Sequence, residues 1–412
     1  MFELTSVLPY FLIMGLLLVL ATGLARRLGF YRSLLQTDQP SRFQTLDGLR
    51  GYLALAVFFH HAAIQKGVYV TGKWQPLPPG FYRWLGPTAV MFFFMITGFL
   101  FWSKAMAKGG RLSPMPLYRN RFWRLAPLYA LSMVLLLGLV AEQSRGRLLV
   151  PPLTLATQVL RTVPLGLTEA PCINTVDTIP LNGGVTWTLR YEWLFYLALP
   201  LLAVLATPTR FAGLAAVTGF LCAVSPSQWL DRDKYCLFFL SGMLAAHLVA
   251  SFPPAPWVKS RWLTPVSFLF LTGTVLWKPW PWGVLPGLLA FLTFVYGNDL
   301  CGLLTRPGPR LLGTISYSIY LLHAMVLWVG LRLANRLVSI AALGGPAYWL
   351  VVSACAVAVV ACSALTYRFV EHPFLLRSHR RPAKSLAGQA QAVQMKIENE
   401  AYHIAPENSR TP

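Results

Sequence analysis

The sequence predicts an all-α fold, a polytopic bundle of transmembrane helices. Of its 412 residues, 56% are hydrophobic and only 12% are charged. A soluble domain of this size could not bury so much apolar surface. The apolar residues also form runs of roughly membrane-spanning length, and a helix satisfies its own backbone hydrogen bonds inside lipid.

Eleven apolar runs are the candidate spans. Pro281 and Pro286 interrupt this pattern, which leaves the count open by one or two spans. Gly98, in the third run, permits the close approach of a neighbouring helix. The runs lie near residues 8–24, 50–66, 86–103, 125–141, 189–206, 211–226, 235–251, 263–277, 282–297, 312–331 and 347–367.

The basic residues predict the orientation in the membrane. The formal net charge is +21, and the basic residues cluster in short connections between the apolar runs. If the amino terminus lies outside, about two thirds of the 35 basic residues fall in inner segments, as the positive-inside rule requires. We therefore expect an external amino terminus and a cytoplasmic carboxy terminus in a plasma membrane, such as a bacterial inner membrane. This distribution of charge argues against a nucleic-acid partner.

Both ends of the chain and its cysteines carry little chemistry. Arg26 and Arg27 follow the first apolar run instead of preceding it, so residues 1–43 predict an uncleaved anchor and a basic cytoplasmic linker. Residues 378–412 are polar and predict a flexible cytoplasmic tail. The six cysteines form no CxxC pair or Cys/His cluster, so no metal site is expected.

An arginine and two histidines lie in one apolar stretch, LDGLRGYLALAVFFHHA. Ionisable groups inside a bilayer are costly, so Arg50, His60 and His61 indicate a function. At about 100° per residue, His61 returns to within about 20° of the Arg50 face, whereas His60 lies about 80° away. His61 would also lie roughly 16 Å along the helix from Arg50, near the middle of the bilayer. Arg50 and His61 therefore predict one functional stripe.

A second group of arginines lies in YRNRFWRLAPLY, where an inner loop runs into a span. Arg121 and Arg124 are three residues apart and share a helix face, whereas Arg119 points elsewhere and is equally well explained by membrane anchoring. Guanidinium groups bind phosphates in a bidentate manner, so Arg121 and Arg124 are candidates for binding a phosphorylated ligand.

The long outer connection, residues 142–186, contains five prolines and cannot form one continuous helix. Its length suggests a partly ordered element that faces the substrate. The span that follows contains Glu192, a carboxylate that needs an Arg or His partner inside the membrane. Tyr196 lies one turn further on, and Trp187 lies at the outer interface. Both aromatics are candidates for substrate binding, but an ordinary interfacial aromatic belt explains them at least as well.

The stretch GTISYSIYLLHA places Ser316, Tyr320 and His323 on one helical face, with His323 at the depth inferred for His61. They are candidates for substrate binding, and a contact between helices is the alternative. Arg368 and Glu371 are three residues apart and predict a local, structural ion pair.

Six of these stretches together resemble the membrane acyltransferase family 3, the multi-span enzymes that O-acylate surface carbohydrates. In chain order they are LDGLRGYLALAVFFHHA, TGFLFW, RNRFWRLAPLY, WTLRYEWLFYLALPLL, SYSIYLLH and YRFVEHPF. The resemblance implies a ten-span acyltransferase domain over residues 44–377, so that the first span is an addition to that core. The family's Arg-x10-His pattern falls on Arg50 and His61, and its Arg-x-x-Arg pair falls on Arg121 and Arg124.

The resemblance implies transfer of an acyl group, expected to be acetyl, from cytoplasmic acyl-CoA to a hydroxyl of an extracytoplasmic or lipid-linked carbohydrate. His61 would be the general base, Arg121, Arg124 and Arg50 would bind the donor phosphates, and Glu192 would orient the histidine or the acceptor. Acyl-CoA is expected as a co-substrate, with no tightly bound cofactor.

Two alternatives stay open at this point. An acyl-histidine intermediate could replace direct transfer. A transporter or flippase of a lipid-linked sugar would also place polar residues inside the membrane, but would not consume acyl-CoA.

Overall fold

The computed structural model describes residues 6–37, 43–207, 230–252, 261–276 and 283–379, which are almost entirely helical. Among these described residues, seven helices are long and apolar enough to cross a membrane. They are α1 (Leu8–Arg27), α3 (Gln44–Thr71), α4 (Phe81–Ala107), α5 (Pro114–Gln143), α8 (Trp187–Leu202), α14 (Ser316–Asn335) and α15 (Gly345–Thr366). Three further apolar helical segments are shorter, namely Tyr235–Ser251 within α10 (Leu230–Ser251), α11 (Thr264–Leu276) and α12 (Val284–Val295). The prediction of a polytopic helical membrane protein is confirmed.

Ten of the eleven predicted spans coincide with these helices. The run at 211–226 lies outside the described residues, as does the predicted tail from residue 380 onward.

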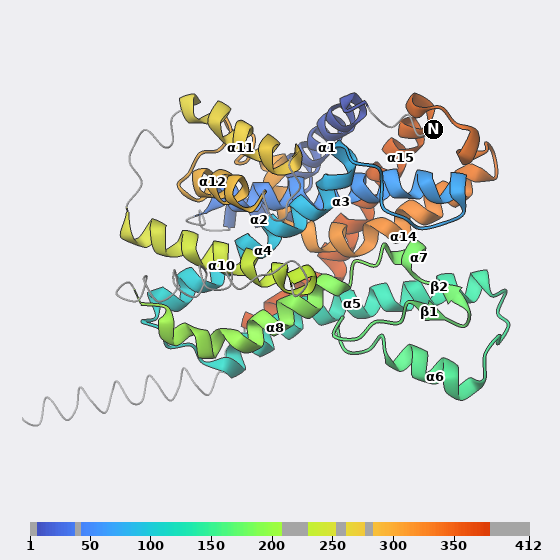
Figure 1. The fold of residues 1–412 in the computed structure, drawn as a ribbon, viewed down its shortest axis with the longest axis horizontal. Coiled ribbons are helices and arrows are strands. Elements are labelled where there is room, and N and C mark those ends of the chain that lie inside the picture. Colours follow the sequence, from blue (N-terminus) through green and yellow to red (C-terminus); the bar gives the residue numbers. More distant parts are fainter. Residues whose placement is uncertain (1–5, 38–42, 208–229, 253–260, 277–282, 380–412) are drawn as a thin grey trace, which may run out of the picture.

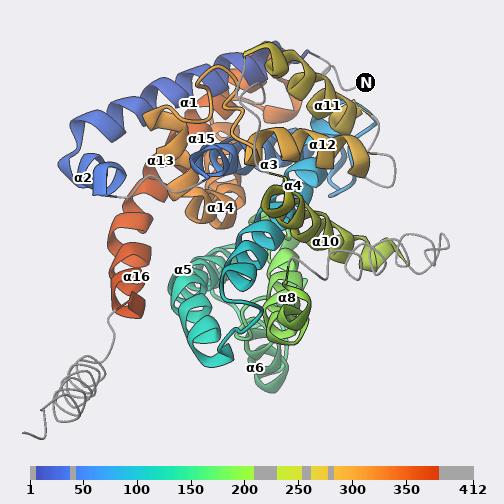
Figure 2. The same cartoon turned by 90° about the vertical axis from the view of Figure 1, so that its left-hand side faces the viewer.

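Helix α3, which carries the Arg50–His61 stretch, lies at the centre of the bundle (Figures 1 and 2). It packs against α4, α14 and the short helix α13 (Pro307–Thr314). Of the residues in its apolar stretch, 78% are buried, compared with 28% in α1 at the edge of the bundle. Polar side chains on α3 therefore face protein and not lipid.

Other helices surround this centre. Helix α10 packs on α4, α15 packs on α14, and α1 packs on α13 and α15. The remaining short elements are α2 (Gly29–Thr37), α16 (His372–His379), the 3-10 turns Ala203–Leu205, Arg261–Leu263 and Ile340–Ala342, and a π-helical turn, Tyr367–Glu371.

The connection between α5 and α8 folds into small elements, as its prolines predicted. Helix α6 (Pro152–Leu160) begins with a proline, whose missing N–H is not needed there. Strands β1 (Cys172–Ile173) and β2 (Val176–Asp177) form an antiparallel hairpin, and a short helix, α7 (Ile179–Asn182), follows. The turn residue Asn174 ties the hairpin down, since its side chain accepts from Leu149 N at 2.8 Å and donates to Arg147 O at 2.7 Å.

Glycines bring α4 and α10 together. A Cβ atom added at Gly98 would lie 2.2 Å from the carbonyl oxygen of Phe239, and one at Gly242 would lie 2.1 Å from that of Met95. No side chain fits at such distances, so the two backbones are in direct contact. The predicted close approach at Gly98 is confirmed.

We expect Gly98→Ala to destabilise the protein by about 1–3 kcal/mol, the usual cost of overpacking, because the obstacle is backbone that cannot rotate away. The measurement is the melting temperature of the purified protein in detergent. Gly138→Ala on α5 is the control, since a Cβ there meets nothing within 4 Å. Equal melting temperatures for the two variants would contradict the packing argument.

Candidate active site

Four cations converge on one cavity at the end of α3 that carries Arg50. This arginine cavity has a volume of about 850 Å³, part of it open to solvent, and includes Arg50 from α3, Lys104 from α4, and Arg121 and Arg124 from α5. The guanidinium of Arg121 lies over the ring of Phe101, 4.8 Å from its centroid. Such a concentration of guanidinium groups suits a ligand with several phosphate oxygens.

Glu192 is the carboxylate of this cavity, contributed by α8. It interacts electrostatically with Arg121, Arg50 and Arg124, and Tyr196 donates a hydrogen bond to its Oε2 at 3.3 Å. Three arginines therefore lie close enough to Glu192 to stabilise its charge, which is the kind of partner that the sequence required. A carboxylate in this position offsets the repulsion among buried cations, which would otherwise separate them.

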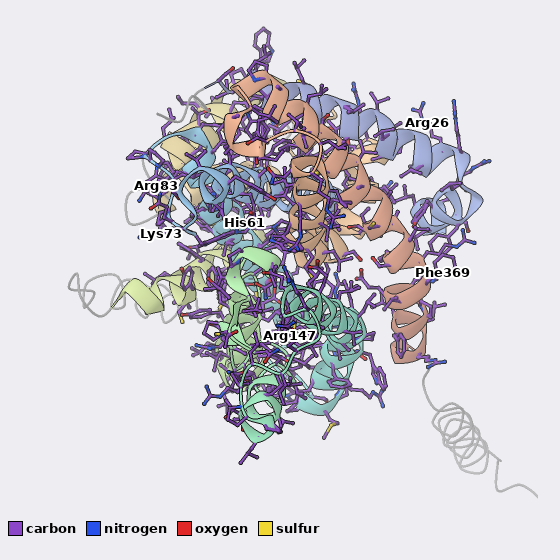
Figure 3. The ribbon with its side chains drawn as sticks, turned by 90° about the vertical axis from the view of Figure 1, so that its right-hand side faces the viewer. Arg26, His61, Lys73, Arg83, Arg147 and Phe369 are labelled. Carbon is purple, nitrogen blue, oxygen red and sulfur yellow. The ribbon has the colours of Figure 1, made fainter. Side chains whose placement is uncertain are left out.

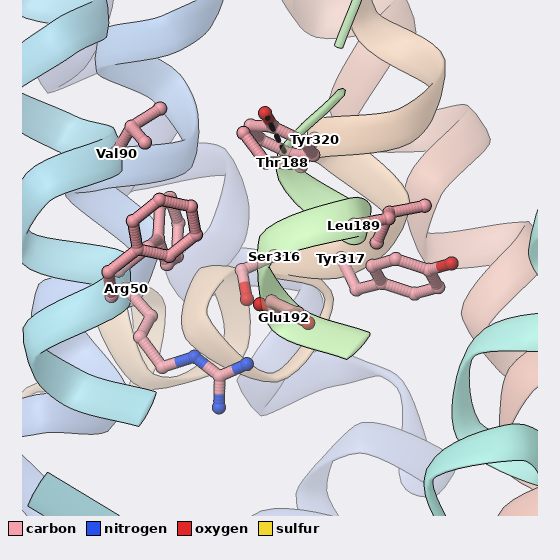
Figure 4. A pocket seen from close by; sticks show the side chains of 10 residues that line it. Arg50, Val90, Thr188, Leu189, Glu192, Ser316, Tyr317 and Tyr320 are labelled. Carbon is pink, nitrogen blue, oxygen red and sulfur yellow. Dashed lines mark hydrogen bonds between the residues drawn. The ribbon is translucent and has the colours of Figure 1, made fainter. Parts of the chain in front are cut away.

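A second, smaller cavity of about 470 Å³, the Tyr320 cavity, adjoins the first and shares Arg50, Glu192 and Tyr317 with it. Figure 4 shows the Arg50 guanidinium and the Glu192 carboxylate facing each other near Ser316. The hydroxyl of Tyr320 lies 3.0 Å from Thr188 Oγ1 and donates to Val185 O at 3.2 Å.

His61 forms a hydrogen-bonded pair with His323. Nδ1 of His61 lies 2.8 Å from Nε2 of His323, and the two rings are stacked with centroids 5.0 Å apart. Both residues are buried, at 9% and 0% exposure. Residues 262 positions apart in the chain are thus joined at the centre of the bundle.

When both rings are neutral, the backbone fixes the positions of their hydrogens. Nδ1 of His323 faces the carbonyl oxygens of Tyr320 at 2.8 Å and Ile319 at 3.1 Å, and carbonyl oxygens only accept. Nδ1 of His323 therefore carries hydrogen, its Nε2 accepts, and Nδ1 of His61 donates. Nε2 of His61 is left with its lone pair, which is the form that a general base requires.

Helix α14 connects the two centres. Ser316 and Tyr320 line the Tyr320 cavity beside Arg50, and His323, one turn further on, binds His61. The face predicted for Ser316, Tyr320 and His323 therefore runs from the arginines to the histidine pair.

His60 faces a different neighbour. Its Nδ1 lies 2.8 Å from Tyr82 O, and its ring fills the space beside Gly86, where an added Cβ would lie 2.5 Å from a ring carbon. The helix geometry that separated His60 from His61 agrees with this arrangement.

A third cavity, of about 930 Å³, is lined by Trp74, whose ring lies 5.7 Å from the ring of His61. This Trp74 cavity is bounded by the carboxy-terminal half of α5, residues that flank the β1–β2 hairpin, α7, the start of α8 and the loop after α3. Trp187 lines it and packs on Tyr235, with ring centroids 4.6 Å apart. In Figure 3, which looks onto this end of the bundle, His61 lies near the middle of the molecule.

Several residues of these cavities were not singled out from the sequence. Lys104 and Tyr317 line the arginine cavity, and Arg310 joins Arg50 and Arg124 in a fourth cavity of about 720 Å³, the Arg310 cavity. Arg310 lies in the short helix α13, between apolar runs. From sequence alone, a cation at such a position is explained by the positive-inside rule. Arg119, by contrast, is exposed.

The predicted ion pair between Arg368 and Glu371 is wrong. The π-helical turn places Arg368 over the rings of Phe30 and Phe369, 5.2 Å from each centroid. Glu371 instead accepts a hydrogen bond from Ser318 on α14 and lines the Arg310 cavity. The i, i+3 pairing assumed a regular α-helix, and the wider π-turn rotates the two side chains apart.

Comparison with known proteins decides the class of this site. A family model described as an acyltransferase domain matches residues 43–368. The chain belongs to acyltransferase family 3. It is therefore a membrane acyltransferase that transfers groups other than amino-acyl groups.

Two curated relatives agree with this assignment. The acyltransferase is 27% identical over 345 residues to the exopolysaccharide production protein ExoZ of Rhizobium meliloti (strain 1021), covering 74% of this chain and 95% of ExoZ. It is also 27% identical over 389 residues to the acyltransferase MdmB of Streptomyces mycarofaciens, covering 83% and 94%. No solved structure matches the chain significantly.

Proposed function

We propose that this acyltransferase transfers an acyl group, most simply acetyl, from cytoplasmic acyl-CoA to a carbohydrate hydroxyl on the outer side of the membrane. The observation that carries the proposal is that Arg50, Arg121 and Arg124 converge on one cavity, while α14 connects that cavity to the His61–His323 pair. The three arginines suit the phosphates of CoA. Membership of the acyltransferase family favours this function over the transport of a lipid-linked sugar.

In the proposed reaction, Nε2 of His61 takes the proton from the acceptor hydroxyl as its oxygen attacks the thioester carbonyl. The C–S bond then breaks, and the proton on His61 passes to the departing CoA sulfur. The products are an ester and free CoA. His61 accepts one proton and donates it again, so no other acid or base is needed. Glu192 holds the arginines in place and does not contact His61, because His323 makes that hydrogen bond.

The test of this function is transfer of label from radiolabelled acetyl-CoA in membranes that contain the protein. We expect label in ester linkage on glycans and stoichiometric release of free CoA. Mass spectrometry of surface glycans from deletion and wild-type cells identifies the product. Movement of glycan without consumption of acetyl-CoA would contradict the proposal.

His323 offers a separate test of the tautomer argument. His323→Leu removes the acceptor for His61 Nδ1 and should lower kcat by roughly 10- to 100-fold, the range typical of groups that orient a functional histidine. His323→Gln keeps an acceptor oxygen and should lose less. The KM for acyl-CoA should stay near that of the wild type in both variants. A His323→Leu enzyme with unchanged kcat would refute the role of His323 as a positioning residue.

A further inference from the structure

The Trp74 cavity differs in chemistry from the cavities at the Arg50 end. Among the residues that the structure describes, no Lys or Arg lines it, whereas four such residues line the arginine cavity. It contains instead two indole rings, Trp74 and Trp187, together with the carboxylate of Glu169 and the amide of Asn182. A pocket with apolar aromatic walls and a few polar groups suits an uncharged ligand that carries hydroxyl groups.

Two residues of this lining lie next to His61. The ring of Trp74 lies 5.7 Å from the His61 ring, centroid to centroid, with 32° between the planes. A Cβ added at Gly183 would lie 3.4 Å from Cε1 of His61. Gly183 also has a φ of +69°, which favours glycine. Because glycine has no side chain, only backbone separates the cavity from His61 at this point.

The Trp74 cavity and the arginine cavity are both connected to the histidine pair, but through different residues. The ring of His61 contacts Trp74 of this cavity and also His323, which in turn follows the Tyr320 and arginine cavities along α14. A ligand in the Trp74 cavity would therefore reach His61 past the loop after α3, and a ligand among the arginines would reach it along α14. The difference in charge favours an anionic ligand among the arginines, because the cation beside the Trp74 cavity, Arg190, is already paired with the Glu169 carboxylate at 3.6 Å.

We propose that the Trp74 cavity binds the acceptor as a neutral sugar unit, stacked on the indole of Trp74, which brings a hydroxyl next to His61. Trp74 is half-buried and lies in the loop after α3, so its ring can adjust to the sugar. Trp187 is fixed, since it packs against Phe94, Tyr191 and Tyr235. The assignment rests on the proposed acyl transfer and names the site of its second substrate.

The test uses the full-length protein in detergent or nanodiscs, with acetyl-CoA as donor and methyl glucoside and methyl galactoside as probe acceptors. Acetylated glycoside and endogenous glycan ester are measured by mass spectrometry, and CoA affinity is measured by titration. Trp74→Ala should raise the KM for the glycosides at least tenfold, or lower glycan acetylation by that factor, and leave the CoA dissociation constant within twofold. Trp74→Phe, which keeps an aromatic face, should recover most of the loss.

A second variant and a control keep the result decisive. Met133→Trp adds volume inside the cavity from α5, and should reduce acceptor use in the same way. Trp262→Ala removes an indole that is 78% exposed elsewhere and should behave as the wild type. If Trp74→Ala and Met133→Trp acylate as well as Trp262→Ala, the acceptor site is wrong while the proposed function stands. If the wild type neither binds CoA nor forms ester on any glycan, the proposed function itself is wrong.

Discussion

Replacing His61 by alanine should lower acyl transfer by roughly 10²- to 10⁴-fold, the usual contribution of a general base. The loss follows because Nε2 of His61 is the nitrogen left with a lone pair once the hydrogen bonds of His323 are assigned. The measurement is the initial rate of ester formation from labelled acetyl-CoA. CoA binding should persist, because His61 lies outside the arginine cavity.

His60 provides the matched control, since it is the same residue type one position away. His60→Ala should cost little transfer activity, because its ring bonds to Tyr82 O and fills space beside Gly86. Both proteins should be recovered from membranes in similar amounts. Similar activity losses in the two variants would contradict the separation of the two faces, and an active His61→Ala enzyme would remove the base assignment.

Removing the charge of Arg124 should raise the KM for acyl-CoA by roughly 10- to 100-fold. A hydrogen bond to a charged group contributes about 1.5–3 kcal/mol, and each 1.36 kcal/mol corresponds to a factor of ten. Arg124 lines both the arginine cavity and the Arg310 cavity, so its loss affects two neighbouring parts of the proposed donor site. Because phosphates are bound equally in the ground and transition states, kcat should change less than KM.

The comparison for this variant is Arg119→Gln. Arg119 lies on the same helix and carries the same charge, but its side chain is exposed. We expect near wild-type kinetics for Arg119→Gln, whereas Arg124→Gln needs more donor for the same rate. An Arg124→Gln enzyme with altered acceptor KM and unchanged donor KM would contradict the phosphate assignment.

Local patterns predicted much of this protein. The apolar runs fixed the positions of the helices, because a span inside lipid needs both length and apolar side chains. The 3.6-residue period placed Arg50 and His61 on one face and separated His60 from it. The same period grouped Ser316, Tyr320 and His323 on one face of α14. In the structure, Ser316 and Tyr320 lie beside Arg50, and His323 lies beside His61.

The remaining features depend on contacts between distant parts of the chain. No local pattern pairs His61 with His323, because the hydrogen bond between them depends on how α3 crosses α14. Trp74 lies in an irregular loop without periodicity, so its approach to His61 left no signal in the sequence. Arg368 and Glu371 were misassigned because a π-turn follows no simple spacing rule.

Arg50 is the residue with the widest consequence, since its one guanidinium lines the arginine, Tyr320 and Arg310 cavities together. A group shared in this way couples the cavities thermodynamically: an anion that draws the guanidinium toward one cavity alters the binding free energy in the other two. Such coupling is reciprocal, so the factor by which an anion in one of these three cavities changes the affinity for a ligand in another must equal the factor in the reverse direction. The three cavities around Arg50 therefore act as one coupled anion site and not as three independent ones.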